Sequence, residues 1–227
     1  MTGVRTASTR RVSIQRPGVR LAGVLMLPAA EFPVPCVVFV HGLGSDKDSP
    51  RNVVIASRLV DEGIAALLFD LSGHGESGKD PRDGREAFVE DLEAAFDWAR
   101  AQPEIDPERI GVAGSSLGGV VALEAARRRL IRPATLVLRA PPAEPHEFVH
   151  IEVPILVIAG EDDPLLFQIR EAVGTSESTT LSTVASAGHL FEEPGTLEQA
   201  VRLAVEWFDA RLRGSPEPAV RNLGEVD

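Results

Sequence analysis

A serine flanked by glycines constrains the fold of this chain more than any other feature. Residues 114–118 read Gly-Ser-Ser-Leu-Gly, a G-x-S-x-G pattern centred on Ser116. The run 109–113 before it suits a short buried strand, and the run 120–126 after it suits a buried helix. On such a sharp strand-to-helix turn the serine backbone is strained, and side chains two residues away on either side would collide with the turn. The flanks disfavour an ordinary glycine- and serine-rich loop, so we expect the Ser116 hydroxyl to stand above a sheet as a nucleophile.

A nucleophilic serine needs a histidine base and a carboxylate that orients the base. On this type of turn the chain order is serine, acid, histidine. Three of the five histidines (His146, His150 and His189) follow Ser116, but only His189 follows a strand-like segment, residues 180–188. The strand predicted over 154–159 leads into Gly-Glu-Asp-Asp-Pro at 160–164, which supplies carboxylates where the acid is expected. Ser116, His189 and a carboxylate from this segment are therefore the candidate catalytic groups.

Backbone N–H groups that stabilise a negative oxygen are expected from another part of the chain. Residues 37–40 form an apolar, β-branched run that is followed by His41-Gly42-Leu43-Gly44. Glycines directly after a strand allow backbone N–H groups to turn toward a site. The N–H of Leu43, together with the N–H of Leu117 at the start of the next helix, can hold a developing oxyanion. We expect His41 to support this loop rather than to act as an acid or base.

Taken together, these motifs resemble the serine hydrolases of the α/β-hydrolase superfamily. The resemblance covers nearly the whole chain in the order typical of the family: residues 41–44, Asp-Leu-Ser-Gly-His-Gly-Glu-Ser at 70–77, then 114–118, 160–164 and Gly188-His189. More narrowly, the chain is similar to small esterases and dienelactone-hydrolase-like members, and residues 42–50 are similar to cinnamoyl and feruloyl esterases. Dienelactone hydrolases use a cysteine nucleophile, whereas this chain has Ser116, which argues against a lactone substrate.

The resemblance also selects the acid. In related hydrolases it usually lies three residues after the glycine that ends the strand, which favours Asp163 over Asp162. Pro164 restricts Asp163 to extended conformations, compatible with a side chain turned toward His189. The implied catalytic set is Ser116, Asp163 and His189, with the oxyanion held by the N–H groups of Leu43 and Leu117.

This set implies cleavage of small carboxylic esters through an acyl-enzyme that water then hydrolyses, without a metal or organic cofactor. A thioesterase or a peptidase would use the same triad. Outside catalysis, the alternative is a ligand-binding protein on a hydrolase fold, and an unreactive Ser116 would distinguish it.

The order of predicted elements indicates an α/β fold. Strands are expected over 11–15, 21–27, 36–40, 64–69, 110–113, 135–139, 154–159 and 179–184, the first two forming a hairpin around Pro17-Gly18. Helices are expected between Pro50 and Gly63, over 85–101, after Ser116, and from Thr196, where 196–199 has the form of a capping box. This alternation predicts the α/β-hydrolase fold, a mainly parallel eight-stranded sheet with helices on both faces.

The site is expected to be open. The segment 140–153 is too short and too often interrupted by proline for a cap domain with its own core. The segment 71–84 is rich in Gly, Asp and Ser and poor in apolar residues, so we expect a mobile rim there rather than a packed lid.

Composition bounds the remaining possibilities. Residues 1–213 are expected to form a single domain, and 214–227 an extended or disordered tail. A net charge of −11 argues against nucleic acid or an anionic membrane as partner, and no apolar run is long enough to span a bilayer. The one cysteine, Cys36, is expected in the core and excludes an internal disulfide. With no signal peptide expected, we predict a cytoplasmic protein that acts on a small-molecule ester; the oligomeric state stays open.

Overall fold

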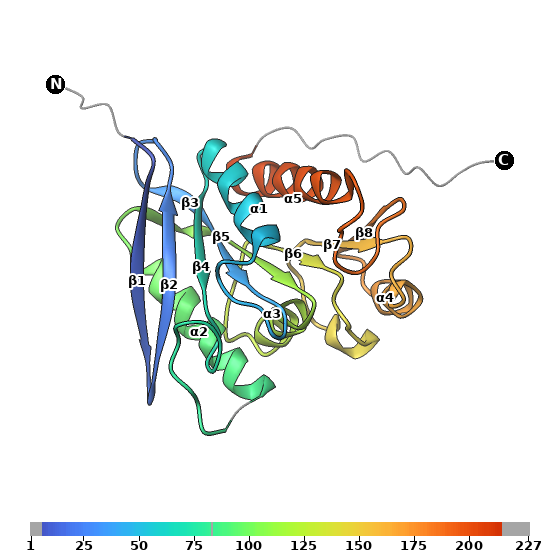
Figure 1. Cartoon of the computed structure of the whole chain (residues 1–227), viewed down its shortest axis with the longest axis horizontal. Coiled ribbons are helices and arrows are strands. Elements are labelled where there is room, and N and C mark those ends of the chain that lie inside the picture. Colours follow the sequence, from blue (N-terminus) through green and yellow to red (C-terminus); the bar gives the residue numbers. More distant parts are fainter. Residues whose placement is uncertain (1–5, 83, 215–227) are drawn as a thin grey trace.

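The computed structural model describes residues 6–82 and 84–214 of the chain (Figure 1). The strands described there are β1 (Ser8–Arg16), β2 (Val19–Leu27), β3 (Val34–Val40), β4 (Ala65–Phe69), β5 (Ile105–Ser115), β6 (Thr135–Arg139), β7 (Ile155–Gly160) and β8 (Thr179–Val184). The helices are α1 (Pro50–Asp61), α2 (Arg85–Arg100), α3 (Leu117–Arg127), α4 (Leu166–Val173) and α5 (Thr196–Arg213), with a short 3₁₀ helix, η1 (Pro145–Glu147).

The strands build one sheet. Over the described residues it has eight strands in the order β1-β2-β4-β3-β5-β6-β7-β8. The strand β2 runs antiparallel to both β1 and β4, and every pair from β4–β3 to β7–β8 is parallel. The β1–β2 hairpin closes at Pro17-Gly18, where Gly18 has a φ of 80° that glycine adopts at little cost. The predicted α/β-hydrolase fold is confirmed.

Two apolar cores lie on opposite faces of the sheet, and side-chain alternation along the strands explains them. In β3, Cys36, Val38 and Val40 face one core, while Val37 and Phe39 face the other. The first core receives apolar side chains from α2, α3 and α4, and the second from α1 and α5 (Figure 1). Burial raises the pKa of the Cys36 thiol to about 12, in keeping with the predicted core position.

The edge where the parallel strands end is the place where a site can form. The carboxyl ends of β3, β5, β6, β7 and β8 meet at this edge, so the segments that follow them converge. Residues 140–154, all of them described, carry one short 3₁₀ turn between β6 and β7 and no cap domain, as predicted. Within 6–82 and 84–214, no helix has both the length and the apolar character needed to cross a membrane.

The start of α5 differs from the prediction. Thr196 is the first helical residue, and the N-cap position belongs to Gly195, whose φ is 80°. The Thr196 hydroxyl donates to the carbonyl oxygen of Glu193 at 2.7 Å. The predicted capping box is therefore wrong, because a tight turn through a left-handed glycine precedes the helix. Of the predicted tail, only Gly214 lies within the described residues.

Candidate active site

Ser116 occupies the turn between β5 and α3, with φ of 49° and ψ of −120°. A non-glycine residue in such a conformation costs of order 1–3 kcal/mol and persists only where its surroundings hold it. Its N–H donates to the carbonyl oxygen of Arg139 at 2.8 Å. A Cβ on Gly114 would lie 2.5 Å from the Gly118 oxygen, and one on Gly118 would lie 2.3 Å from the Val40 oxygen. Both glycines of the motif are therefore steric requirements, as the sequence predicts.

The histidine and the acid approach Ser116 from the ends of two other strands. The Nε2 atom of His189, after β8, lies 3.2 Å from the Ser116 Oγ. Its Nδ1 atom lies 2.9 Å from the Oδ2 of Asp163, after β7. Because an ionised carboxylate only accepts hydrogen bonds, Nδ1 carries the proton and the Nε2 lone pair faces the hydroxyl. The Asp163 side chain is buried, whereas His189 keeps 29% of its side chain exposed.

Asp163, rather than Asp162, makes the expected contact with His189. The second Asp163 oxygen, Oδ1, accepts the N–H of Leu165 at 2.9 Å, so both carboxylate oxygens are in use. Asp162 is exposed, and its backbone N–H donates to the carbonyl of Ala187 at 2.9 Å. Local loop geometry therefore turns the two neighbouring carboxylates in different directions.

The two predicted oxyanion donors lie beside the serine. Leu117 is the first residue of α3, so its N–H has no partner inside the helix. No acceptor among the described residues bonds to the N–H of Leu43. A Cβ on Gly42 would lie 3.3 Å from the Ser115 carbonyl oxygen and 3.5 Å from the Ser116 Cβ, so this loop passes directly against the turn. Both N–H groups are thus available to an acceptor bound near Ser116.

His41 supports the loop that carries Leu43, as predicted. Its Nε2 accepts the N–H of Leu71 at 3.0 Å, and its Nδ1 donates to the Gly42 carbonyl oxygen at 2.8 Å. This pattern needs a neutral ring, and burial lowers the pKa of His41 below its usual value. Because the peptide unit between Gly42 and Leu43 is planar, fixing its carbonyl oxygen also fixes the direction of the Leu43 N–H.

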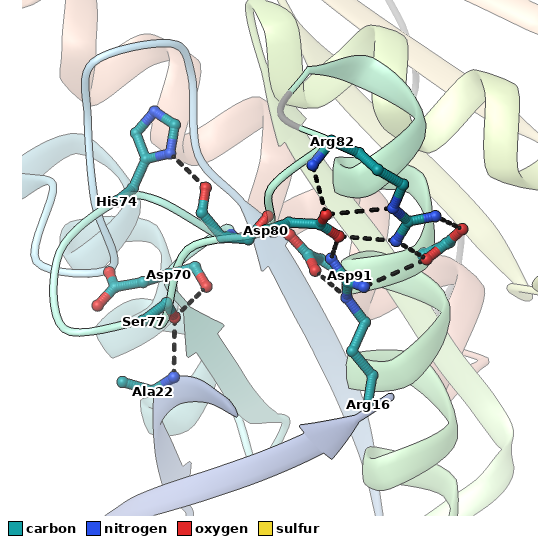
Figure 2. Close-up of polar contacts among 10 residues, drawn as sticks. Arg16, Ala22, Asp70, His74, Ser77, Asp80, Arg82 and Asp91 are labelled. Atoms are coloured by element: carbon teal, nitrogen blue, oxygen red, sulfur yellow. Dashed lines mark hydrogen bonds and ion pairs between the residues drawn. The ribbon is translucent and has the colours of Figure 1, made fainter. Parts of the chain in front are cut away.

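The segment after β4 is anchored to the protein body, so the predicted mobile rim is wrong for its described part. The Ser77 hydroxyl donates to the Asp70 carbonyl oxygen at 2.6 Å and accepts the N–H of Ala22 at 2.9 Å (Figure 2). The N–H of Ser72 donates to Asp91 Oδ2 at 2.7 Å. These contacts join the segment to β2 and α2.

A buried ion cluster holds the far end of the same segment. Arg16, at the end of β1, contacts Asp80 at 2.6 Å and also bonds to Asp91 (Figure 2). Arg82 adds bonds to Asp80 and to Glu90 of α2. Arg16 is 64 residues from Asp80 and 75 from Asp91 along the chain, and no local pattern in the sequence indicates such distant pairs.

A buried arginine beneath the turn was also missed from the sequence. Arg139 ends β6 opposite Ser115, and its guanidinium donates to Asn52 Oδ1 of α1 at 3.0 Å. Burial lowers its pKa to about 10, and the positive charge of Arg51 acts in the same direction. Arg139, Asn52 and Ser115 line a cavity of about 10 Å³, roughly the space of one water molecule. This site supports the turn and has no room for a substrate.

What this edge offers a ligand is apolar surface rather than metal ligands. Leu43, Phe167 and Leu190, which follow β3, β7 and β8, are large apolar residues with 74%, 72% and 47% of their area exposed. In the described part of the chain, no group of three or more His, Cys, Asp and Glu side chains is arranged to hold a metal ion.

The chain is similar to proteins with this fold and turn. Residues 32–149, more than half of the chain, match the family model described as Serine aminopeptidase, S33. A crystal structure of a dienelactone hydrolase from Anabaena variabilis superposes with a TM-score of 0.82 at 31% identity, covering 92% of this chain and all of that one. An α/β serine hydrolase without lid from Xanthomonas campestris has a TM-score of 0.76 at 26% identity, covering 92% and 97%.

A longer relative comes from Mycobacterium tuberculosis H37Rv and bears the name "Putative phosphoribosyl transferase". It is 34% identical over 210 residues, which are 88% of this chain and 46% of that protein. The chain therefore spans about half the length of this curated relative. From the family match and the shared fold, the chain belongs to the α/β-hydrolase superfamily, in the family described as Serine aminopeptidase, S33.

Proposed function

We propose that the protein is a serine hydrolase that cleaves small carboxylic esters through an acyl-enzyme intermediate. The observation that carries this proposal is the continuous chain of hydrogen bonds from Ser116 through His189 to Asp163, built on a strained turn. In an ordinary polar loop, nothing would require a serine with a strained, positive φ whose hydroxyl faces the lone pair of a histidine.

Each group then has a role in the reaction. His189 removes the Ser116 proton through Nε2 as the hydroxyl oxygen attacks the ester carbonyl carbon. Asp163 holds the proton on Nδ1 and stabilises the imidazolium that forms. The N–H groups of Leu43 and Leu117 receive the negative oxygen of the tetrahedral intermediate. The imidazolium protonates the leaving alcohol, and a water molecule activated by the same histidine then releases the acid.

The substrate class follows from the surroundings of the serine. The segment after β6 adds only one turn of 3₁₀ helix. Leu43 carries one of the proposed oxyanion donors, Leu190 directly follows His189, and both leucines are exposed. An uncovered site with apolar borders buries only part of an acyl chain, so selectivity between short esters is expected to be shallow. Short, soluble esters such as acetates and butyrates are the proposed substrates.

The test compares two adjacent serines. Ser116→Ala removes the attacking oxygen, and for a triad hydrolase the loss in kcat from removing the nucleophile reaches about 10⁶. Ser115→Ala is the matched control, because Ser115 lies on the strand side of the turn and should keep most of the activity. Hydrolysis of p-nitrophenyl acetate by both variants, together with labelling by a fluorophosphonate, measures the difference. Equal losses in the two variants would contradict the assignment of the nucleophile.

The nature of the cleaved bond needs a second comparison. The same groups can act on thioesters and amides, and the description of the family model names an aminopeptidase. We expect p-nitrophenyl butyrate to react faster than the matched thioester and the matched p-nitroanilide. Faster release of the anilide would favour a peptidase, and a serine inert to both substrate and fluorophosphonate would favour a ligand-binding protein.

A further inference from the structure

The loop that carries Leu43 is held at its start by His41, and its remaining part needs further support. It runs from His41 to Asp48, between β3 and α1, and the Leu43 side chain is 74% exposed, so packing does not fix it. Gly44 has a φ of 69°, and the N–H of Ser45 donates back to the Gly42 carbonyl oxygen at 3.2 Å. A donor for an oxyanion must nevertheless hold its direction before the reaction begins. His41 restrains the start of the loop through the Gly42 carbonyl oxygen, and the other end of the loop needs a restraint of its own.

Asp70 supplies such a restraint from the end of β4. Its side chain is fully buried, and Oδ1 accepts the backbone N–H of Lys47 at 2.7 Å. Oδ2 accepts the N–H of Glu76 at 2.8 Å and contacts the Lys47 Nζ at 3.2 Å. A Cβ on Gly75 would lie 2.3 Å from this oxygen, so glycine at 75 leaves the space that the carboxylate fills. One carboxylate thus joins the Leu43 loop to the turn 73–77.

Lys47 completes the link as a buried cation. Only 5% of its side chain is exposed, and Nζ lies 2.9 Å from Glu76 Oε2 and 3.2 Å from Asp48 Oδ2, besides its contact with Asp70. Burial alone would lower the pKa of Lys47, but its bonds to Glu76, Asp70 and Asp48 hold that pKa above its usual value. The ammonium therefore stays charged and is bound by carboxylates from both segments.

We propose that Asp70 and Lys47 are positioning residues that, from the other end of the loop, act with His41 to fix the Leu43 N–H for the oxyanion. The proposal rests on the ester hydrolysis proposed above and gives a role to the Asp-Leu-Ser-Gly-His-Gly-Glu-Ser motif at 70–77. Asp70 touches no reacting atom. It acts through Lys47 and the loop. Its loss should therefore reduce the stabilisation of the transition state and leave the binding of the ground-state ester nearly unchanged.

Asp70→Asn tests this directly, and Asp91→Asn is the matched control. Both aspartates are fully buried, bind a buried cation and accept a backbone N–H of the segment after β4, from Glu76 for Asp70 and from Ser72 for Asp91. Asp91 faces Arg16 and Ser72 and contacts no residue of the Leu43 loop (Figure 2). A general loss of stability should therefore affect both variants, whereas a loss of oxyanion stabilisation should affect only Asp70→Asn.

The measurements are kcat and KM on p-nitrophenyl acetate, at a temperature where circular dichroism shows both variants folded. Removing an oxyanion donor outright costs about 10²–10³ in kcat, so a displaced donor in Asp70→Asn should cost about 10–100-fold, with KM within about twofold. Asp91→Asn should stay within about twofold of the wild type in both constants. If Asp70→Asn does not fold, Lys47→Met, which keeps the backbone N–H bond, should show a smaller loss in kcat, again without a change in KM.

Inhibition by phenylboronic acid supplies an independent readout. Its boron bonds to the Ser116 Oγ while the serine proton passes to His189, and one oxygen of the tetrahedral boronate enters the oxyanion site. Its binding to Asp70→Asn should weaken by the same factor as kcat/KM. Equal kcat losses in Asp70→Asn and Asp91→Asn, or unchanged boronate binding, would overturn the positioning role. Retained activity in Ser116→Ala would instead overturn the proposed function itself.

Discussion

Replacing Asp163 by Asn should leave the shape of the site intact and reverse the proton arrangement on His189. One oxygen of Asp163 accepts the Leu165 N–H at 2.9 Å, and the other faces His189 Nδ1 at 2.9 Å. An asparagine has a single oxygen, and turning its NH₂ group toward Leu165 would set two donors against each other. The oxygen must therefore stay with Leu165, which places the NH₂ group against Nδ1. His189 then becomes protonated on Nε2 and cannot accept the Ser116 proton.

The loss from this wrong tautomer is large. Where a triad aspartate is replaced by asparagine without a change in geometry, kcat falls about 10⁴-fold. Each factor of ten in rate is about 1.36 kcal/mol, so the change amounts to about 5.4 kcal/mol of transition-state free energy. The assay is steady-state hydrolysis of p-nitrophenyl acetate. The control is Asp162→Asn, because Asp162 is the neighbouring residue and is exposed. A loss below about tenfold for Asp163→Asn, or an equal loss for Asp162→Asn, would refute this reasoning.

Three further predictions concern the fold, its pH dependence and the substrate. Gly118→Ala places a Cβ 2.3 Å from the backbone oxygen of Val40 and should abolish soluble expression. Gly63→Ala, with open space around it at a φ of 84°, should stay soluble and cost about 1–3 kcal/mol; soluble yield separates the two variants, and thermal unfolding measures the cost in Gly63→Ala. Burial lowers the pKa of His41 in the folded state, so below about pH 6.5 the unfolded chain binds that proton first and the unfolding free energy falls. Urea unfolding across this range should show a smaller fall for His41→Gln, whose side-chain oxygen can still accept the Leu71 N–H, and an equal fall would contradict the buried neutral ring. Finally, rates should be highest on acetates and butyrates, and a sharp rate increase when a long-chain ester exceeds its solubility would indicate a lid.

The parts of the site that could be predicted are those with local steric or chain-order signals. Gly114 and Gly118 mark the turn because only glycine fits there, and the apolar runs on both sides identify the strand and helix. The order of serine, acid and histidine along the chain then limited the search to His189 and the segment 160–164. The two-sided burial of the parallel strands made them readable as apolar runs, so the sheet was also predictable.

The parts that could not be predicted depend on contacts between distant segments. Arg16 meets Asp91 across 75 residues, and Asp70 meets Lys47 across 23, yet each residue alone looks like an ordinary surface charge in the sequence. The same applies to Arg139, which ends a strand of mainly apolar residues, yet is buried and donates to Asn52 of α1, 87 residues away. Polar composition therefore suggested a mobile segment at 71–84, whereas contacts with buried charged groups anchor residues 72–82 of it.

The candidate catalytic groups and the connection that could cover them come from different parts of the sheet edge. Ser116, Asp163 and His189 follow β5, β7 and β8, and the segment 140–154 lies between β6 and β7 without supplying any of them. The registers of β6 with β5 and of β7 with β6 are set by paired buried strands, so residues inserted into 140–154 would enter from the solvent side. Long insertions in such connections cost little loop-closure free energy. A helical lid grafted at this point would therefore cover the candidate site and select among the proposed acyl groups, with Ser116, Asp163 and His189 left unchanged.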